Sequence, residues 1–174
     1  MKKITSAGPH YEVSLLLHNI RSIHNVGSIF RTADAFGVKR MYLSGYTPAP
    51  LDRFGRKRAD LAKVALGAED NVGWEIVATE LSAFFKRIKK EQSAIIIALE
   101  QNENSINYKE VGSKLSSNRD KGPVEILLVL GEEVKGITPE ILSFADIIAE
   151  IPMNGIKESL NVSVATGIAL FGMF

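Results

Sequence analysis

The sequence predicts an α/β fold in which a mainly parallel β-sheet is covered by helices on both faces. Apolar segments of strand length alternate along the chain with segments whose apolar residues recur at helical spacing. Two strand segments, 94–99 and 126–130, are continuous apolar runs, which is typical of buried central strands in parallel sheets. We expect one domain over residues 1–174, because this length suffices for one core and is short for two.

The first part of the chain is predicted to form a β-α-β unit. Strands are expected at 13–17 and 39–44, and a helix is expected between them over 26–36. Asn25 is the predicted N-cap of this helix, and Gly37 is placed to end it. A short helix between two strands favours a parallel pair.

The remaining elements continue the alternation of strands and helices. The predicted strands are 74–79, 94–99, 126–130 and 146–151, and the predicted helices are 81–90, 138–144 and an apolar helix near the end of the chain. Thr138 and Pro139 mark the start of the second of these helices. Ser159 and Asn161 are two candidate caps for the last one. The polar segment 101–123 is expected to be connecting structure, with weak signals of ordered structure around 108–115.

A dense basic stretch follows the proline-containing loop after the second predicted strand. Its cations are Arg53, Arg56, Lys57, Arg58 and Lys63, with Asp52 and Asp60 among them. Two interpretations are open: a solvated charged face, or a clamp for RNA phosphates, which Arg and Lys commonly contact. Since the net charge of the whole chain is only +1, nucleic-acid binding would need such a local patch.

The composition excludes several classes of site. There is no cysteine, which rules out disulfides, thiolate catalysis and Cys-ligated metal clusters. The N-terminal residues lack a signal-peptide pattern, and no apolar run reaches membrane-spanning length. We expect a soluble cytoplasmic protein without a membrane association.

Polar residues concentrate in three loops, 19–25, 131–136 and 153–161, each of which follows a predicted strand. In open parallel sheets, ligands bind outside the carboxyl ends of the strands, where loops lead into helix N-termini. We expect the three loops to converge on one site. An ordinary capped helix after each loop is the structural alternative.

Three segments of the chain carry a family resemblance. Residues 25–37 (NVGSIFRTADAFG), 130–137 (LGEEVKGI) and 151–165 (IPMNGIKESLNVSVA) resemble, in order and spacing, the three signature motifs of the SpoU (TrmH) family of RNA ribose 2'-O-methyltransferases in the SPOUT superfamily. The resemblance implies a C-terminal trefoil knot, S-adenosylmethionine as cofactor, a homodimer and no metal.

The resemblance also implies roles for individual residues. Cofactor contacts fall on Gly131, Ile151, Met153 and Leu160, and the catalytic, RNA-facing group is Asn25, Arg31, Glu133, Ser159 and Asn161. Arg31 would stabilise the developing alkoxide as much as act as a base, because a guanidinium holds its proton strongly. Glu133 would fix Arg31 or Asn25. The structural alternatives are a surface arginine, a solvated carboxylate and, for Asn161, a helix cap.

The function that the resemblance implies is methylation of a ribose 2'-hydroxyl in structured RNA. We expect tRNA rather than rRNA, because no added RNA-binding segment is apparent in a minimal chain. The alternative is a non-catalytic RNA-binding or ribosome-assembly factor that keeps the knotted fold. A nucleotide-binding α/β enzyme is less consistent with the sequence, which lacks both the G-x-G-x-x-G and the P-loop patterns.

Overall fold

The computed structural model describes residues 11–115 and 123–174 of the chain. Seven strands form one sheet in the order β3-β2-β1-β6-β4-β7-β5, and every neighbouring pair is parallel. The strands are β1 (Tyr11–His18), β2 (Arg40–Ser44), β3 (Trp74–Val77), β4 (Ile95–Leu99), β5 (Ile106–Asn107), β6 (Val124–Leu130) and β7 (Ile147–Glu150). The predicted α/β class is confirmed, with a sheet that is entirely parallel.

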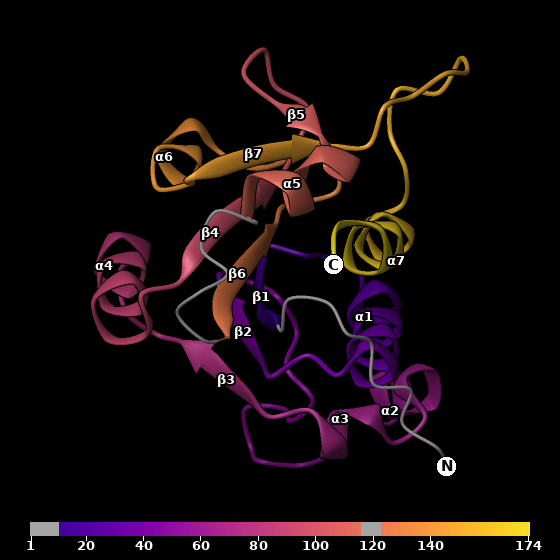
Figure 1. Ribbon diagram of the computed structural model, residues 1–174. Coiled ribbons are helices and arrows are strands. Elements are labelled where there is room, and N and C mark those ends of the chain that lie inside the picture. Colours follow the sequence, from indigo (N-terminus) through magenta and orange to yellow (C-terminus); the bar gives the residue numbers. More distant parts are fainter. Residues whose placement is uncertain (1–10, 116–122) are drawn as a thin grey trace, which may run out of the picture.

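Helices cover both faces of this sheet (Figure 1). They are α1 (Ile23–Phe36), α2 (Ala59–Ala65), α3 (Ala68–Asn71), α4 (Leu81–Gln92), η1 (Tyr108–Glu110), α5 (Val111–Leu115), α6 (Pro139–Leu142) and α7 (Val162–Met173). The helices α1, α2, α3 and α7 lie on one face, and α4 and α6 lie on the other. Of the described helices, none has the length and apolar character needed to cross a membrane.

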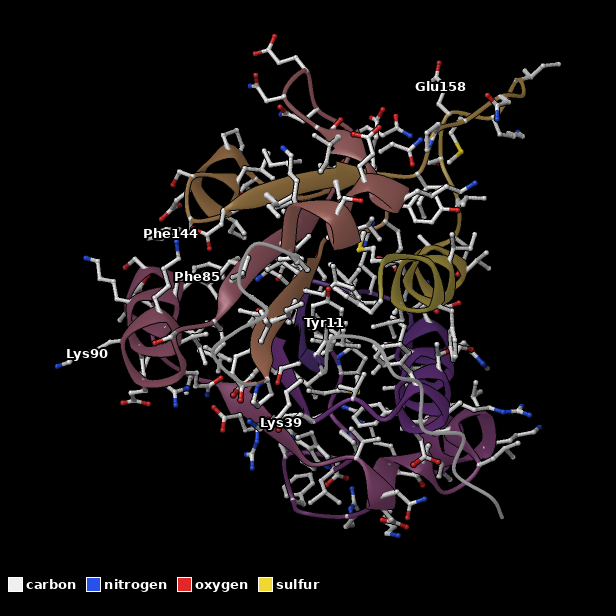
Figure 2. All side chains as sticks on the ribbon, viewed as in Figure 1. Tyr11, Lys39, Phe85, Lys90, Phe144 and Glu158 are labelled. Atoms are coloured by element: carbon white, nitrogen blue, oxygen red, sulfur yellow. The ribbon has the colours of Figure 1, made fainter. Side chains whose placement is uncertain are left out.

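The core is divided by the sheet into two clusters. Along β1, Leu15 and Leu17 pack into the cluster under α1 and α7, while Leu16 packs into the cluster under α4. All three side chains are fully buried, and each such burial contributes about 1.5–3 kcal/mol. Phe85 of α4 stacks on Phe144, with ring centroids 5.0 Å apart. Both side chains are labelled in Figure 2. Successive side chains along a strand thus contribute alternately to the core clusters on the two faces of the sheet.

The strand order brings the carboxyl ends of the central strands together. β6 lies between β1 and β4, with Leu17 paired to Leu130 and Ala98 paired to Val129. The loops that leave β1, β4 and β6 consequently emerge side by side. This is the edge at which an open parallel sheet binds ligands.

Two expectations for local structure were wrong, and a third was confirmed in part. Helix α1 begins at Ile23, because Ser22 rather than Asn25 is its N-cap: the Ser22 hydroxyl accepts a hydrogen bond from the Asn25 N–H at 3.3 Å. Ser159 does not cap α7; Asn161 does, accepting from Ser163 N–H at 2.9 Å. The segment 101–123 holds a short strand, β5, that its polar composition concealed.

Other expectations lie partly outside the described residues. The absence of a signal-peptide pattern concerns residues 1–10, and the end of the connecting segment falls on 116–122. The knot implied by the family resemblance stays a prediction.

Candidate active site

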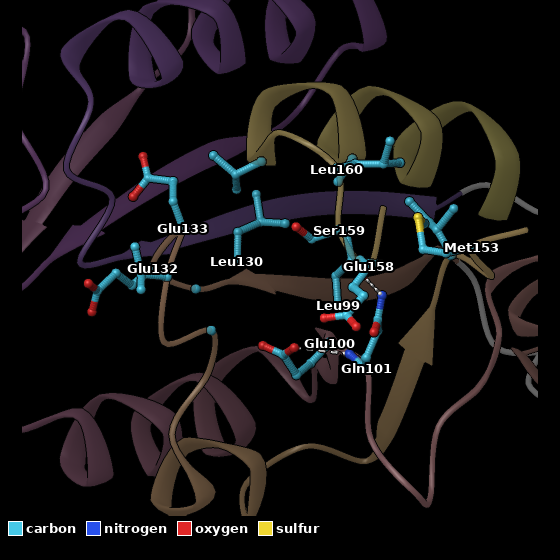
Figure 3. Close-up of a pocket in the computed structure, with 16 residues that line it drawn as sticks. Leu99, Glu100, Gln101, Leu130, Glu132, Glu133, Met153, Glu158, Ser159 and Leu160 are labelled. Carbon is cyan, nitrogen blue, oxygen red and sulfur yellow. Dashed lines mark hydrogen bonds between the residues drawn. The ribbon is translucent and has the colours of Figure 1, made fainter. Parts of the chain in front are cut away.

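A cavity of about 370 Å³ lies at the carboxyl edge of the sheet. Its walls come from the ends of β4 and β6, the loop 131–137, the loop 151–161 and the first turn of α7 (Figure 3). All four residues predicted to contact the cofactor line it: Gly131, Ile151, Met153 and Leu160. Its volume is within the usual range for small-molecule sites.

One wall of the cavity is a tight backbone hairpin. Glu132 and Gly136 form an antiparallel bridge, and the Gly136 N–H donates to the Glu132 carbonyl at 2.9 Å. A Cβ at Gly131 would lie 2.6 Å from the Gly136 carbonyl oxygen, so only glycine allows this approach. Gly136 itself has φ +66°, a conformation that glycine adopts without strain. The backbone of this hairpin is therefore set by two glycines.

The cavity is acidic and partly apolar. Four carboxylates belong to residues of its wall, and no lysine or arginine is found among the described residues that line it. The acidic residues are Glu100, Glu132, Glu133 and Glu158. Leucine, isoleucine and methionine side chains supply the apolar surface. A cationic ligand with an apolar body suits such a site, and a phosphate does not.

A chain of hydrogen bonds joins the three polar loops 19–25, 131–136 and 153–161 beside the cavity. The Asn25 amide donates to Glu133 Oε1 at 2.8 Å, and the Asn161 amide donates to Asn25 Oδ1 at 3.1 Å. Asn161 Oδ1 in turn accepts from the Ser163 hydroxyl at 2.6 Å. Because these residues are 108 and 136 positions apart in sequence, only the fold brings them together.

Glu133 lies at the N-terminus of α1. Its carboxylate accepts from Arg21 N–H at 3.1 Å and Ser22 N–H at 3.3 Å, in addition to Asn25. Burial alone would raise the pKa of Glu133, but these hydrogen bonds outweigh it and hold that pKa below its ordinary value. The side chain is thus an anion at neutral pH, and it fixes Asn25, one of the two partners expected for it.

Ser159 and Arg31 are placed differently. Ser159 lines the cavity and is exposed. Arg31 lies on the exposed side of α1, outside the cavity wall, and has no hydrogen-bond or ion-pair partner within residues 11–115 and 123–174. Its guanidinium is consequently not held by Glu133.

The basic stretch is less uniformly cationic than its sequence suggests. Arg56 pairs with Asp52 at 2.8 Å, and Lys57 pairs with Asp70, outside the stretch, at 2.6 Å. Arg58 precedes α2, and its buried Nε has no partner in the part of the chain that the structure describes. The two other cations are Arg53 and Lys63, and both are exposed.

Two polar residues of the site that follow β4 were missed by the sequence analysis. Glu100, directly after β4, accepts from Ile137 N–H at 2.7 Å and so ties the glycine hairpin to the neighbouring strand. Gln101 donates to the Glu158 carbonyl at 2.6 Å and holds the loop 151–161, as the dashed line in Figure 3 shows. The sequence did contain a signal for both residues: they directly follow the apolar run 94–99, and residues after a buried parallel strand lie at the edge of the sheet where ligands bind.

Comparison with known proteins agrees with this geometry. Residues 12–171 match the model of the SpoU rRNA Methylase family. A tRNA (guanosine(18)-2'-O)-methyltransferase of Aquifex aeolicus is 33% identical over 153 residues, covering 88% of this chain and 64% of that protein. The chain thus spans less than two thirds of that relative's length.

Two solved structures have similar folds. An AdoMet-bound rRNA methyltransferase from Sinorhizobium meliloti superposes with a TM-score of 0.76 at 26% identity, over 95% of this chain and 57% of that one. A structure described as giving insights into the 2-OH methylation of C/U34 on tRNA has a TM-score of 0.69 at 25% identity, over 95% of both chains. With the family model matched over nearly the whole chain, this protein belongs to the SpoU rRNA Methylase family.

Proposed function

We propose that this protein is an RNA 2'-O-ribose methyltransferase that uses S-adenosylmethionine. The observation that carries the proposal is the hydrogen-bonded chain from Glu133 through Asn25 to Asn161 at the rim of an acidic cavity. The cavity fits this cofactor, because its carboxylates suit a sulfonium cation and its apolar side chains suit an adenosine. When bound, the cofactor supplies a methyl group on that sulfonium.

The residues of this chain would divide the remaining work. Gly131, Ile151, Met153 and Leu160 would hold the cofactor along the cavity wall. Asn25, Asn161 and Ser159 would orient the ribose through amide and hydroxyl hydrogen bonds, with Glu133 keeping Asn25 in position. Arg31 would stabilise negative charge on the 2'-oxygen as the hydroxyl loses its proton.

We further propose tRNA as the substrate, in a cytoplasmic setting. The relatives are named for both tRNA and rRNA methylation. The solved structure whose length matches, with 95% of both chains covered, is described as giving insights into methylation of tRNA. The basic stretch 53–63 would contact RNA phosphates. It runs into α2, which packs directly on α1, the helix that carries Asn25 and Arg31. The packing is close: a Cβ at Gly27 of α1 would lie 2.9 Å from Val64 Cβ of α2.

We also propose a homodimer. Helix α7 carries no charged residue, and its Val164 and Phe171, seven positions apart on one face, are 50% and 63% exposed. An apolar helix surface of this kind is commonly covered by a second copy. Sedimentation of the wild type and of Val164→Glu tests this, and a monomeric wild type would contradict it.

The deciding experiment is nucleoside mass spectrometry of unmodified tRNA and rRNA after incubation with the protein and S-adenosylmethionine. A new 2'-O-methyl nucleoside in tRNA is the expected product. Binding of RNA without cofactor binding or product would instead support the non-catalytic factor.

Arg31→Ala tests the assigned chemistry within the same assay. We expect loss of methyl transfer by a factor of about 100 or more, the scale of removing an oxyanion-stabilising group. Cofactor affinity measured by calorimetry should be unchanged, because Arg31 lies outside the cavity wall. Retained turnover would contradict the role.

A further inference from the structure

A small hairpin at residues 51–57 presents an aromatic side chain to solvent between two arginines. Leu51 and Lys57 form an antiparallel bridge that closes the hairpin. Phe54, at its tip, is 67% exposed. The Arg53 guanidinium carbon lies 4.7 Å from the centroid of its ring and that of Arg56 lies 5.1 Å from it. An exposed phenylalanine with two cation-π neighbours has no role in the core.

The hairpin is held in one shape by Asp52. Its Oδ1 accepts from Phe54 N–H at 2.8 Å and from Arg56 N–H at 3.0 Å, while Oδ2 accepts from Arg56 Nε at 2.8 Å. The Asp52 N–H donates to the Arg56 carbonyl at 2.9 Å, and Gly55 supplies the positive φ of +77° that the turn requires. These bonds, led by the Arg56 N–H, lower the pKa of Asp52 and keep it ionised. The backbone of the hairpin that carries Phe54 is therefore preorganised.

We infer that Phe54 is a stacking platform for an unpaired base of the RNA substrate. Proteins hold single-stranded nucleotides by stacking bases on aromatic side chains and arginine planes. Arg53 has no carboxylate partner among the described residues, so its charge is available to the adjoining phosphate. This inference rests on the proposed function, and it adds an uncharged contact to a region whose other predicted RNA contacts are all cationic.

The location of the hairpin fits this role. It leads directly into α2, which packs against α1, the helix that carries Asn25 and Arg31. In Figure 1, α1 lies between α7 and α2. An RNA strand that enters the site along α1 would reach residues 51–57 next.

Stacking and phosphate contact are separated by their salt dependence. We would measure binding of a short single-stranded oligoadenylate, and of the same strand in a duplex, over a series of salt concentrations. Phe54→Ala should weaken single-strand binding by about 5- to 150-fold, the effect of losing one base stack, with the salt slope unchanged. Arg53→Ala should instead reduce the slope by about one ion. Duplex binding should change little in Phe54→Ala, because paired bases are not available for stacking.

Control variants identify the aromatic ring as the cause. Phe54→Tyr should bind like the wild type, and Phe54→Leu should bind like Phe54→Ala. Ile76→Ala, which alters a side chain of similar exposure (61%) on the edge strand β3, should have no effect. Wild-type affinity for the single strand in Phe54→Leu would overturn the inference. Loss of dimerisation in Phe54→Ala would also overturn it, because the ring would then pack against a second copy of the chain. Failure of the wild type to bind any RNA would instead overturn the proposed function.

Discussion

The two walls of the cavity are built in opposite ways. The wall formed by residues 131–137, the hairpin wall, is fixed by contact of Gly131 with the Gly136 backbone and by the Ile137 N–H bond to Glu100. The wall formed by residues 151–161, the loop wall, is mostly exposed, and Ile156 is 99% exposed. Within the described residues, Gln101 supplies the single hydrogen bond to positions 152–160.

This difference indicates how the site works. The hairpin wall carries Glu133 and so sets the position of Asn25 before any ligand binds. The loop wall leaves β7 and projects from the body of the molecule (Figure 1). Segments with few buried contacts open at low free-energy cost. We expect the hairpin wall to stay fixed and the loop wall to become ordered as it closes on the cofactor.

The largest effect should come from Gly131→Ala. The new Cβ meets backbone atoms at 2.6 Å, so the hairpin wall must shift, at a cost of about 1–3 kcal/mol in the free energy of unfolding. S-adenosylmethionine affinity should fall about tenfold or more, as 1.4 kcal/mol of distortion would cause. Thermal unfolding and calorimetric titration measure the two effects. Gly155→Ala in the loop wall is the matched control, because its Cβ meets nothing within 4 Å. Equal effects in both variants would remove the distinction between the walls.

A smaller effect is expected for Glu133→Gln. The Glu133 carboxylate accepts three hydrogen bonds, and losing its charge should lower the free energy of unfolding by about 1 kcal/mol. The loss is small for a charged acceptor because the side chain is exposed to solvent. The pKa of Glu133 is lowered on folding, so its contribution is present above the ordinary carboxyl pKa of about 4.3 and is lost as the pH falls through the lowered value.

Urea unfolding of the wild type and Glu133→Gln across this pH range tests the sign. The stability difference between them should shrink in acid, whereas Glu140→Gln, an exposed control on α6, should match the wild type throughout. A difference that grows in acid would contradict the assigned hydrogen bonds.

Gln101→Ala should release the loop wall with little effect on global stability. One exposed hydrogen bond contributes about 0.5–1 kcal/mol at most. Trypsin should cleave after the exposed Lys157 several times faster in this variant, and S-adenosylmethionine should slow cleavage in the wild type. Gln92→Ala, which removes a hydrogen bond to Tyr42 away from the cavity, is the control. An unchanged cleavage rate would show that another contact holds the loop.

The smallest effect should come from Ile156→Ala. A side chain that is 99% exposed contributes little to folding, so the free energy of unfolding should stay within about 0.5 kcal/mol of the wild type in thermal melts. A larger loss that depends on protein concentration would mean that this side chain packs against a second copy.

Much of the fold could be predicted because its signals are local. The continuous apolar runs marked β4 and β6 as central strands, and Gly37 marked the end of α1, where it has φ +89°. Caps were harder, since Ser22 and Asn25 both suit that position and their competition is settled by tertiary contacts. Once Glu133 binds the Asn25 amide, the Ser22 hydroxyl takes the cap. The partner of Lys57 was also missed, because Asp70 lies 13 positions away and outside the basic stretch.

By itself, the sequence determined the alternation of elements, the parallel sheet and the three loops that would carry the site, because hydrophobic periodicity and turn residues act over a few positions. Only the tertiary structure decided that Glu133 holds Asn25 rather than Arg31, that Glu100 and Gln101 support the cavity walls, and that four acidic residues gather in the lining of one cavity. Each of these depends on which strands are neighbours. That order follows from packing the whole chain around one sheet, and no local pattern records it.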